Sequence, residues 1–113
     1  MAIFINHEEI IFQDHPMFQG VKIAKLAGKQ DGSPIGVSLL RIGQGVEIPV
    51  HTHESSVDSV YCTRGSGEMF HDGSWSRIEK GGYCLVPAGE EHGVRNTGDQ
   101  SMELFIVHCP PLF

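Results

Sequence analysis

The chain lacks the features that mark several common function classes. Basic residues are scarce: eight Lys and Arg stand against fourteen Asp and Glu, for a formal net charge of −6. This balance repels phosphate backbones and anionic lipid, so we expect neither nucleic acid nor a membrane as a partner. No run approaches the roughly 20 apolar residues of a membrane span, and the N-terminus does not resemble a signal peptide. We therefore expect a cytoplasmic protein.

Cysteine is also sparse. Cys62, Cys84 and Cys109 are odd in number and widely spaced, and no Cys-x-x-Cys occurs. This pattern argues against a disulfide framework and against a zinc knuckle. We interpret all three as small buried hydrophobic residues. Cys62 alone keeps a link to the candidate site described below, because it follows Asp58 with the same strand parity.

No segment shows a long helical period, and the 113 residues argue for one domain, residues 1–113. Fourteen glycines and six prolines divide the chain into short runs rich in Val, Ile, Leu, Phe and Tyr. Asp-Gly and Gly-Gly pairs between such runs are hairpin signals, so the sequence predicts an all-β antiparallel sandwich or barrel. Strands are expected at Val21–Leu26, Ile35–Ile42, Val46–His53, Val57–Thr63, Gly67–Phe70, Trp75–Ile78, Tyr83–Val86, Gly93–Asn96 and Met102–His108.

Residues 1–20 fit this rhythm less well. Ile3–Ile5 and Ile10–Phe12 are expected to form short strands that pair with an edge of the same barrel or of a second copy. A chain this short buries only a modest core. We therefore expect a homodimer, in which pairing of these strands removes exposed sheet edges.

The segment Val50–His53 holds the first chemical signal. Side chains two residues apart in a strand point to the same face, so His51 and His53 present two imidazoles together. Both can reach one ion at the usual metal–nitrogen distance of about 2.1 Å. A lone His-x-His is equally typical of ordinary surface or core histidines, so a metal site needs a second sequence signal to support it. That signal is His92, which follows a predicted Pro87–Gly89 turn and begins the next strand.

In combination, these pieces resemble the two motifs of the cupin superfamily. The first motif is a glycine, five residues, His-x-His, three or four residues, a glutamate, six residues and a glycine. The second is a glycine, five residues, Pro-x-Gly, two residues, His, three residues and Asn. The residues of this chain that match are Gly45, His51, His53, Asp58 and Gly65 for the first motif, and Gly81, Pro87, Gly89, His92 and Asn96 for the second.

The resemblance implies a single-domain cupin β-barrel of the jelly-roll, double-stranded β-helix type, with residues 35–108 as its core. It also implies one divalent transition metal held by His51, His53, Asp58 and His92. Three imidazoles and a carboxylate suit Fe, Mn, Ni, Zn, Co or Cu. We expect Asn96 to fix the backbone rather than to touch the ion.

The chain departs from the family at Asp58, where glutamate is usual. Aspartate is shorter by about 1.5 Å, the length of one carbon–carbon bond. The backbone could approach more closely, Asp58 could act through water, or the ion could be held mainly by three histidines. Glu54, the only nearby alternative, directly follows His53 and should point away from the ion.

These features favour a metal-dependent enzyme that acts on a small polar, oxygen-rich substrate which chelates the metal. Dioxygenase, lyase or decarboxylase, and isomerase chemistry are all compatible, and no catalytic base stands out. The alternative is a non-catalytic module that binds a metal or a small ligand such as a sugar. Arg41, Arg64 and Arg95 are candidates for holding a substrate carboxylate through bidentate pairing, although each is better explained as a solvated surface residue. The remaining histidines, which carry no spacing signal, are left outside the site: His7, His15, His71 and His108.

Overall fold

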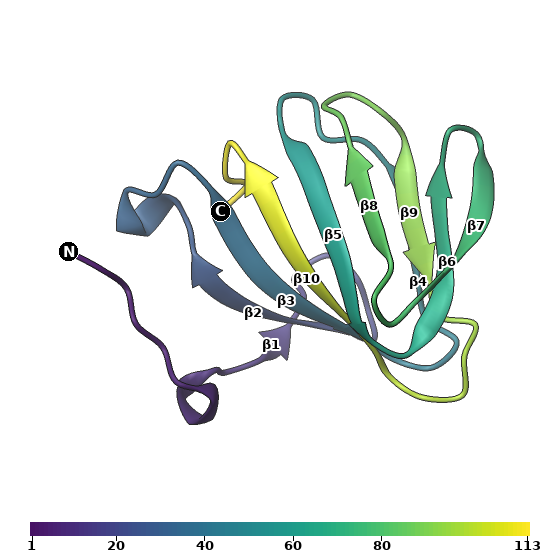
Figure 1. The fold of residues 1–113 in the computed structure, drawn as a ribbon, viewed down its shortest axis with the longest axis horizontal. Helices are drawn as coiled ribbons and strands as arrows, with labels where there is room; N and C mark the ends of the chain where they lie inside the picture. The colour runs from purple at the N-terminus through teal and green to yellow at the C-terminus, as the bar shows by residue number, and fades with distance from the viewer.

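The computed structural model describes all 113 residues as two antiparallel β-sheets that face each other (Figure 1). The first sheet has the strand order β1-β2-β3-β10-β5-β8, and the second has the order β4-β9-β6-β7. This arrangement confirms the expected all-β, jelly-roll fold. The strands are β1 (Gln13–Asp14), β2 (Val21–Ala27), β3 (Gly36–Ile42), β4 (Glu47–His51), β5 (Val57–Arg64), β6 (Ser66–His71), β7 (Ser74–Glu79), β8 (Tyr83–Val86), β9 (His92–Arg95) and β10 (Met102–Cys109).

All nine predicted strands form, with ends that differ from the predictions by at most two residues. The difference that matters most lies at β4, which ends at His51, so that His53 belongs to the loop that follows. The register between β4 and β9 shifts between Ile48 and His51, which is a local irregularity at the same point. The strand rule therefore explains the position of His51 better than that of His53.

The N-terminal prediction was wrong in detail. Neither Ile3–Ile5 nor Ile10–Phe12 forms a strand; a short 3-10 helix, η1 (His7–Glu9), lies between them. Only β1 extends the sheet, and it pairs with β2 of the same chain. Figure 1 shows the preceding segment running outside the barrel, and its apolar side chains stay largely exposed. The second 3-10 helix is η2 (Lys29–Asp31), and neither helix is long and apolar enough to cross a membrane.

The core fills the space between the sheets and follows the pleat of the strands. Along β10, the even-numbered residues Met102, Leu104 and Ile106 are buried while their neighbours are more exposed. Val60 and Cys62 on β5 continue the same layer. The buried apolar residues form one cluster: Val21, Ile23, Leu40, Ile42, Ile48, Val60, Cys62, Met69, Ile78, Val86, Val94, Met102, Leu104 and Ile106.

Asn96 fixes the backbone at the end of β9, as expected. Its side-chain amide donates to the carbonyl oxygens of Ile42 and Gln100, both at 2.9 Å. Its Oδ1 accepts a hydrogen bond from the N–H of Gly98 at 3.0 Å. These bonds tie the end of β3 to the loop before β10 at the end of the barrel opposite the histidines.

Candidate metal centre

Two backbone features bring His51 and His92 together. His51 closes β4 and His92 opens β9, and the two are direct partners across the antiparallel pair. Gly93 allows this close approach, because a Cβ atom there would lie 3.0 Å from the Ile48 carbonyl oxygen. The two imidazole centroids are 4.4 Å apart.

The loop that carries His53 is tied to the turn before β9. The N–H of Gly89 donates to the carbonyl oxygen of His53 at 2.8 Å. Gly89 has a φ of +82°, the left-handed conformation that favours glycine in such turns. As a result the His53 ring lies 4.9 Å from that of His51 and 5.0 Å from that of His92. The nitrogens of all three rings lie within 4.8 Å of one another.

Backbone carbonyls set the tautomers of two of these rings. The Nδ1 of His51 is 2.7 Å from the Pro49 carbonyl oxygen, and the Nδ1 of His92 is 3.1 Å from that of Glu90. A carbonyl can only accept, so each Nδ1 carries the proton in these bonds. In the neutral rings the free lone pair is then on Nε2. This is the arrangement that orients histidine ligands in metal sites.

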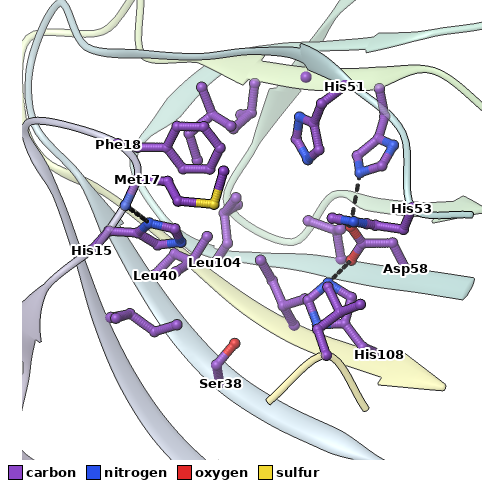
Figure 2. A pocket seen from close by; sticks show the side chains of 18 of the residues that line it. His15, Met17, Phe18, Ser38, Leu40, His51, His53, Asp58, Leu104 and His108 are labelled. Carbon is purple, nitrogen blue, oxygen red and sulfur yellow. Dashed lines mark hydrogen bonds and ion pairs between the residues drawn. The ribbon is translucent and has the colours of Figure 1, made fainter. Parts of the chain in front are cut away.

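Asp58 lies at the centre of the histidines. Its Oδ2 is 3.0 Å from the Nε2 of His92 and 3.7 Å from the Nε2 of His53, and its Oδ1 is 3.3 Å from the Nε2 of His108 (Figure 2). The carboxylate is almost fully buried, at 5% exposure. His108 is its direct partner across the β5–β10 pair. The structure thus brings together all four residues expected from the sequence and adds a fifth, His108.

Mutual interactions set the charges in this cluster. Burial alone would raise the pKa of the Asp58 carboxyl, but the imidazoles of His108 and His92 hold this pKa well below its usual range. Burial lowers the pKa of His53 to about 4, against a smaller opposing effect of Asp58. For His92, the Asp58 carboxylate outweighs burial and raises the pKa. At neutral pH the site therefore contains a buried anion and at least one neutral imidazole.

Residues 38–108, the greater part of this chain, match the family described as the Cupin domain. This match includes every side chain of the cluster described above. The chain belongs to the cupin family.

Two curated relatives cover parts of this cupin. An oxalate-binding protein of Thermotoga maritima is 32% identical over 69 residues, which are 60% of this chain and 56% of that protein. An L-ectoine synthase of Teredinibacter turnerae is 31% identical over 86 residues, which are 74% of this chain and 63% of that enzyme. The chain thus spans less than two thirds of the length of either protein.

Solved structures support the fold over almost the whole chain. The crystal structure of a predicted oxalate decarboxylase from Thermotoga maritima superimposes with a TM-score of 0.85, covering 97% of this chain and 99% of that one at 23% identity. At this identity the likeness shows a common cupin fold and nothing more specific.

The donor set of this cupin is suited to a divalent ion. His92 Nε2, one of the four expected donor atoms, is buried and has no hydrogen-bond partner of good geometry, which is unusual for a buried polar atom. Two donors bound to one ion at about 2.1 Å and at right angles lie about 3.0 Å apart. The distance between Asp58 Oδ2 and His92 Nε2 is 3.0 Å. Because Asp58 approaches this closely, the shorter side chain does not keep it from the histidines.

The cluster opens into a cavity of about 510 Å³ between the two sheets. Beside the cluster, the walls carry Met17 and Phe18 from the loop before β2, together with Leu40 and Leu104 (Figure 2). The Phe18 ring centroid lies 5.8 Å from that of His51. None of the three arginines considered above lines this cavity. Arg41 pairs with Glu103 at 3.0 Å and Arg95 pairs with Glu68 at 2.8 Å. The structure thus favours the interpretation of these arginines as surface residues over a role in holding a substrate carboxylate in this cavity.

His108 is the residue that the spacing analysis missed. The cupin motifs do not include it, but the strand predicted at Met102–His108 carried a usable signal. Within that strand His108 has the parity of Met102, Leu104 and Ile106, three apolar residues that point inward. Cys62, which shares its parity with Asp58, instead lies fully buried in the core, and its thiol donates to the Arg64 carbonyl oxygen at 3.4 Å.

Proposed function

We propose that this cupin is a metal-dependent enzyme in which His51, His53, Asp58 and His92 hold one divalent transition metal. The observation that carries the proposal is the convergence of three imidazoles and one buried carboxylate at the end of a cavity between the two sheets. A bound metal at this position would polarise a chelating oxygen or lower the pKa of a bound water.

The side chains of this chain have distinct roles in the proposal. His51 and His92 offer Nε2 because their Nδ1 protons are held by backbone carbonyls. Asp58 provides the negative charge, and His108 orients its second oxygen. The apolar walls exclude water and so strengthen the electrostatic interactions inside the cavity. The substrate would enter this cavity and present oxygen atoms to an ion held by the four ligands.

The two curated relatives support different functions, one catalytic and one limited to binding. L-Ectoine synthase is named as an enzyme, which supports catalysis, and the oxalate-binding protein is named for binding alone. A non-catalytic ligand-binding module is therefore the second candidate. It is favoured by the scarcity of other polar groups that could serve as a general base: apart from the four proposed ligands and His108, the polar side chains of the cavity are His15, Lys25, Ser38 and Thr52.

Two measurements test the proposal in sequence. Elemental analysis of protein purified without chelators should find one transition metal per chain. A content far below one that no reloading improves would contradict the metal site. Metal-loaded protein is then assayed for oxygen consumption and for loss of chelating hydroxy- and keto-acids, with a His51→Ala, His53→Ala double variant as control. Binding without turnover would replace the enzyme with the binding module.

We also propose that residues 1–113 form one cupin domain and that two copies associate. Strands from residue 13 to residue 109 join the two sheets, which supports a single domain. An exposed apolar patch on the outer face of the first sheet supports association, because such patches commonly mark contacts between proteins. Light scattering should give the mass of a dimer at micromolar concentration, and a monomer mass would contradict the proposal. The patch consists of Tyr61, Tyr83, Leu85 and Phe105.

A further inference from the structure

Polarity is distributed unevenly along the cavity. Most of the ionisable side chains gather at one end, where Asp58 lies among His53, His92 and His108 (Figure 2). His15, beside Phe18, and Lys25 are ionisable residues outside this group. The other walls are mostly apolar. Half of the 24 lining residues are hydrophobic, including Phe18 and Met17 at the rim and Phe113 from the C-terminus.

Small polyanions and sugars fit this cavity poorly. Lys25 is the only lysine or arginine that lines it, and its ammonium lies 4.9 Å from the Phe113 ring centroid. A second carboxylate of a small diacid would find no cationic partner deeper inside. A sugar would need many hydrogen bonds, but apart from the histidine cluster and His15 the polar side chains near it are those of Ser38 and Thr52. Burying polar groups without partners is costly, so these ligands would be disfavoured.

The size of the cavity points in the same direction. A volume of about 510 Å³ lies in the range of sites that enclose a drug-sized molecule. A two-carbon acid would leave most of this volume to water beside apolar walls. The walls would contribute binding energy only to a ligand that covers them.

We infer that the ligand of this site is amphipathic: one bidentate oxygen head that reaches the ion, joined to an apolar body about the size of an aromatic ring. The body packs between Phe18 and the inner faces of Leu40 and Leu104. This inference rests on the proposed metal site and narrows its substrate class from small polar molecules to apolar chelators.

Matched hydroxamates test the inference, because acetohydroxamate and benzohydroxamate share one chelating head and differ only in their apolar bodies. The full chain is loaded with one equivalent of Co(II), whose d–d absorption reports whether the head reaches the ion. Titration calorimetry then gives the two affinities. We expect benzohydroxamate to bind at least about 10-fold more tightly, the effect of burying an apolar group of this size.

Variants at the rim locate the preference. Phe18→Ala, measured on protein loaded with one equivalent of Co(II), should reduce the ratio of the two affinities toward one. Met17→Ser should reduce the same ratio, and because Met17 lines the cavity yet is 78% exposed, we expect this change to cost little stability. Ile11→Ser is the matched control, because Ile11 is equally exposed and lies outside the cavity.

The outcomes separate this inference from the proposed function. Equal affinities of the two hydroxamates for the Co(II) protein would overturn the inference and leave the metal site intact. Tighter binding of benzohydroxamate without a change in the d–d spectrum would also overturn it, since the head would not have reached the ion. A chain that binds no Co(II) would overturn both.

Discussion

The same two strands build opposite ends of the barrel in different ways. On β5 and β10, the side chains that point into the barrel include Cys62 and Leu104 at one end and Asp58 and His108 at the other. Cys62 is the direct partner of Leu104 across the two strands, and Asp58 is the direct partner of His108. At the first end the positions are apolar and close-packed; at the second they are ionisable and leave buried atoms without hydrogen-bond partners. The same inward face of the two strands therefore contributes to the stability of the fold at one end and to the candidate site at the other. Substitutions at the apolar end should mainly change the free energy of unfolding, and substitutions at the ionisable end should mainly change the metal affinity.

The largest effect on stability is expected at the apolar end. Ile42 is fully buried there and does not line the cavity. Ile42→Ala should lower the free energy of unfolding by about 2–5 kcal/mol, through lost burial and the cavity that remains. Urea denaturation measures this loss, and metal titration should show an unchanged affinity. A comparable loss of metal affinity would mean that the two ends are not independent.

At the ionisable end, metal should supply the stability that packing does not. Metal at 100 times its dissociation constant should add about 2.7 kcal/mol. Adding a chelator should therefore lower the melting temperature, and restoring the metal should raise it again. The His51→Ala, His53→Ala double variant should show neither shift. Equal responses of this variant and the native chain would place the metal effect elsewhere.

The fold could be predicted from the sequence because it rests on local rules. Glycine and proline turns separated the strands, and alternating apolar residues identified their inward faces. The grouping of His51, His53, Asp58 and His92 was implied by the resemblance of the two motifs to those of the cupin superfamily. The prediction for the N-terminal segment failed because it rested on composition alone. Ile3–Ile5 has the composition of a strand, but a strand also needs a free sheet edge with which to pair. The edge next to β2 is taken by β1 instead.

The rest of the site depends on contacts between distant segments. The loop before β2 and the C-terminal Phe113 reach the cavity from opposite ends of the chain, and no motif spacing encodes this. His108 lies 50 residues from Asp58 along the chain, and the register of β10 against β5 decides that they meet. Strand parity places His108 on the inward face but does not identify its partner.

Asp58, where this chain departs from its family, is expected to show an intermediate effect. Asp58→Asn should weaken metal binding sharply, because it removes the only anionic ligand while keeping the shape. Since the carboxylate already reaches within 3.0 Å of His92, we expect the extra methylene of Asp58→Glu to overpack the site and cost about 1–3 kcal/mol. Titration calorimetry of the three proteins with one metal compares them.

Two outcomes would revise that view of Asp58. A higher affinity for Asp58→Glu would show that the aspartate reaches the ion only through water. Equal affinities of all three proteins would show that Asp58 takes no part, leaving a three-histidine site.

The smallest effect on metal affinity is expected at His108. Substitutions there also distinguish most clearly between residues that bind the ion and residues that orient its ligands. Its Nε2 lies 3.3 Å from Asp58 Oδ1, so a neutral ring can donate to that oxygen while Oδ2 faces His92 and His53. Removing such an orienting partner typically weakens metal binding at least ~10-fold. We therefore expect His108→Ala to lose about this much affinity and His108→Gln, which keeps an N–H donor, to recover most of it. His71→Ala, on the barrel surface, is the control.

A direct role for His108 would give a different result. His53, Asp58 and His108 also lie close enough to form a ligand set of their own. If the ion occupied that position, His108→Ala would be as damaging as His53→Ala, and glutamine would not rescue it. The nitrogen hyperfine pattern of the Cu(II)-loaded protein separates the two cases, because it loses one imidazole only if His108 is a ligand. An unchanged pattern together with rescue by glutamine would establish that His108 acts on the metal through Asp58.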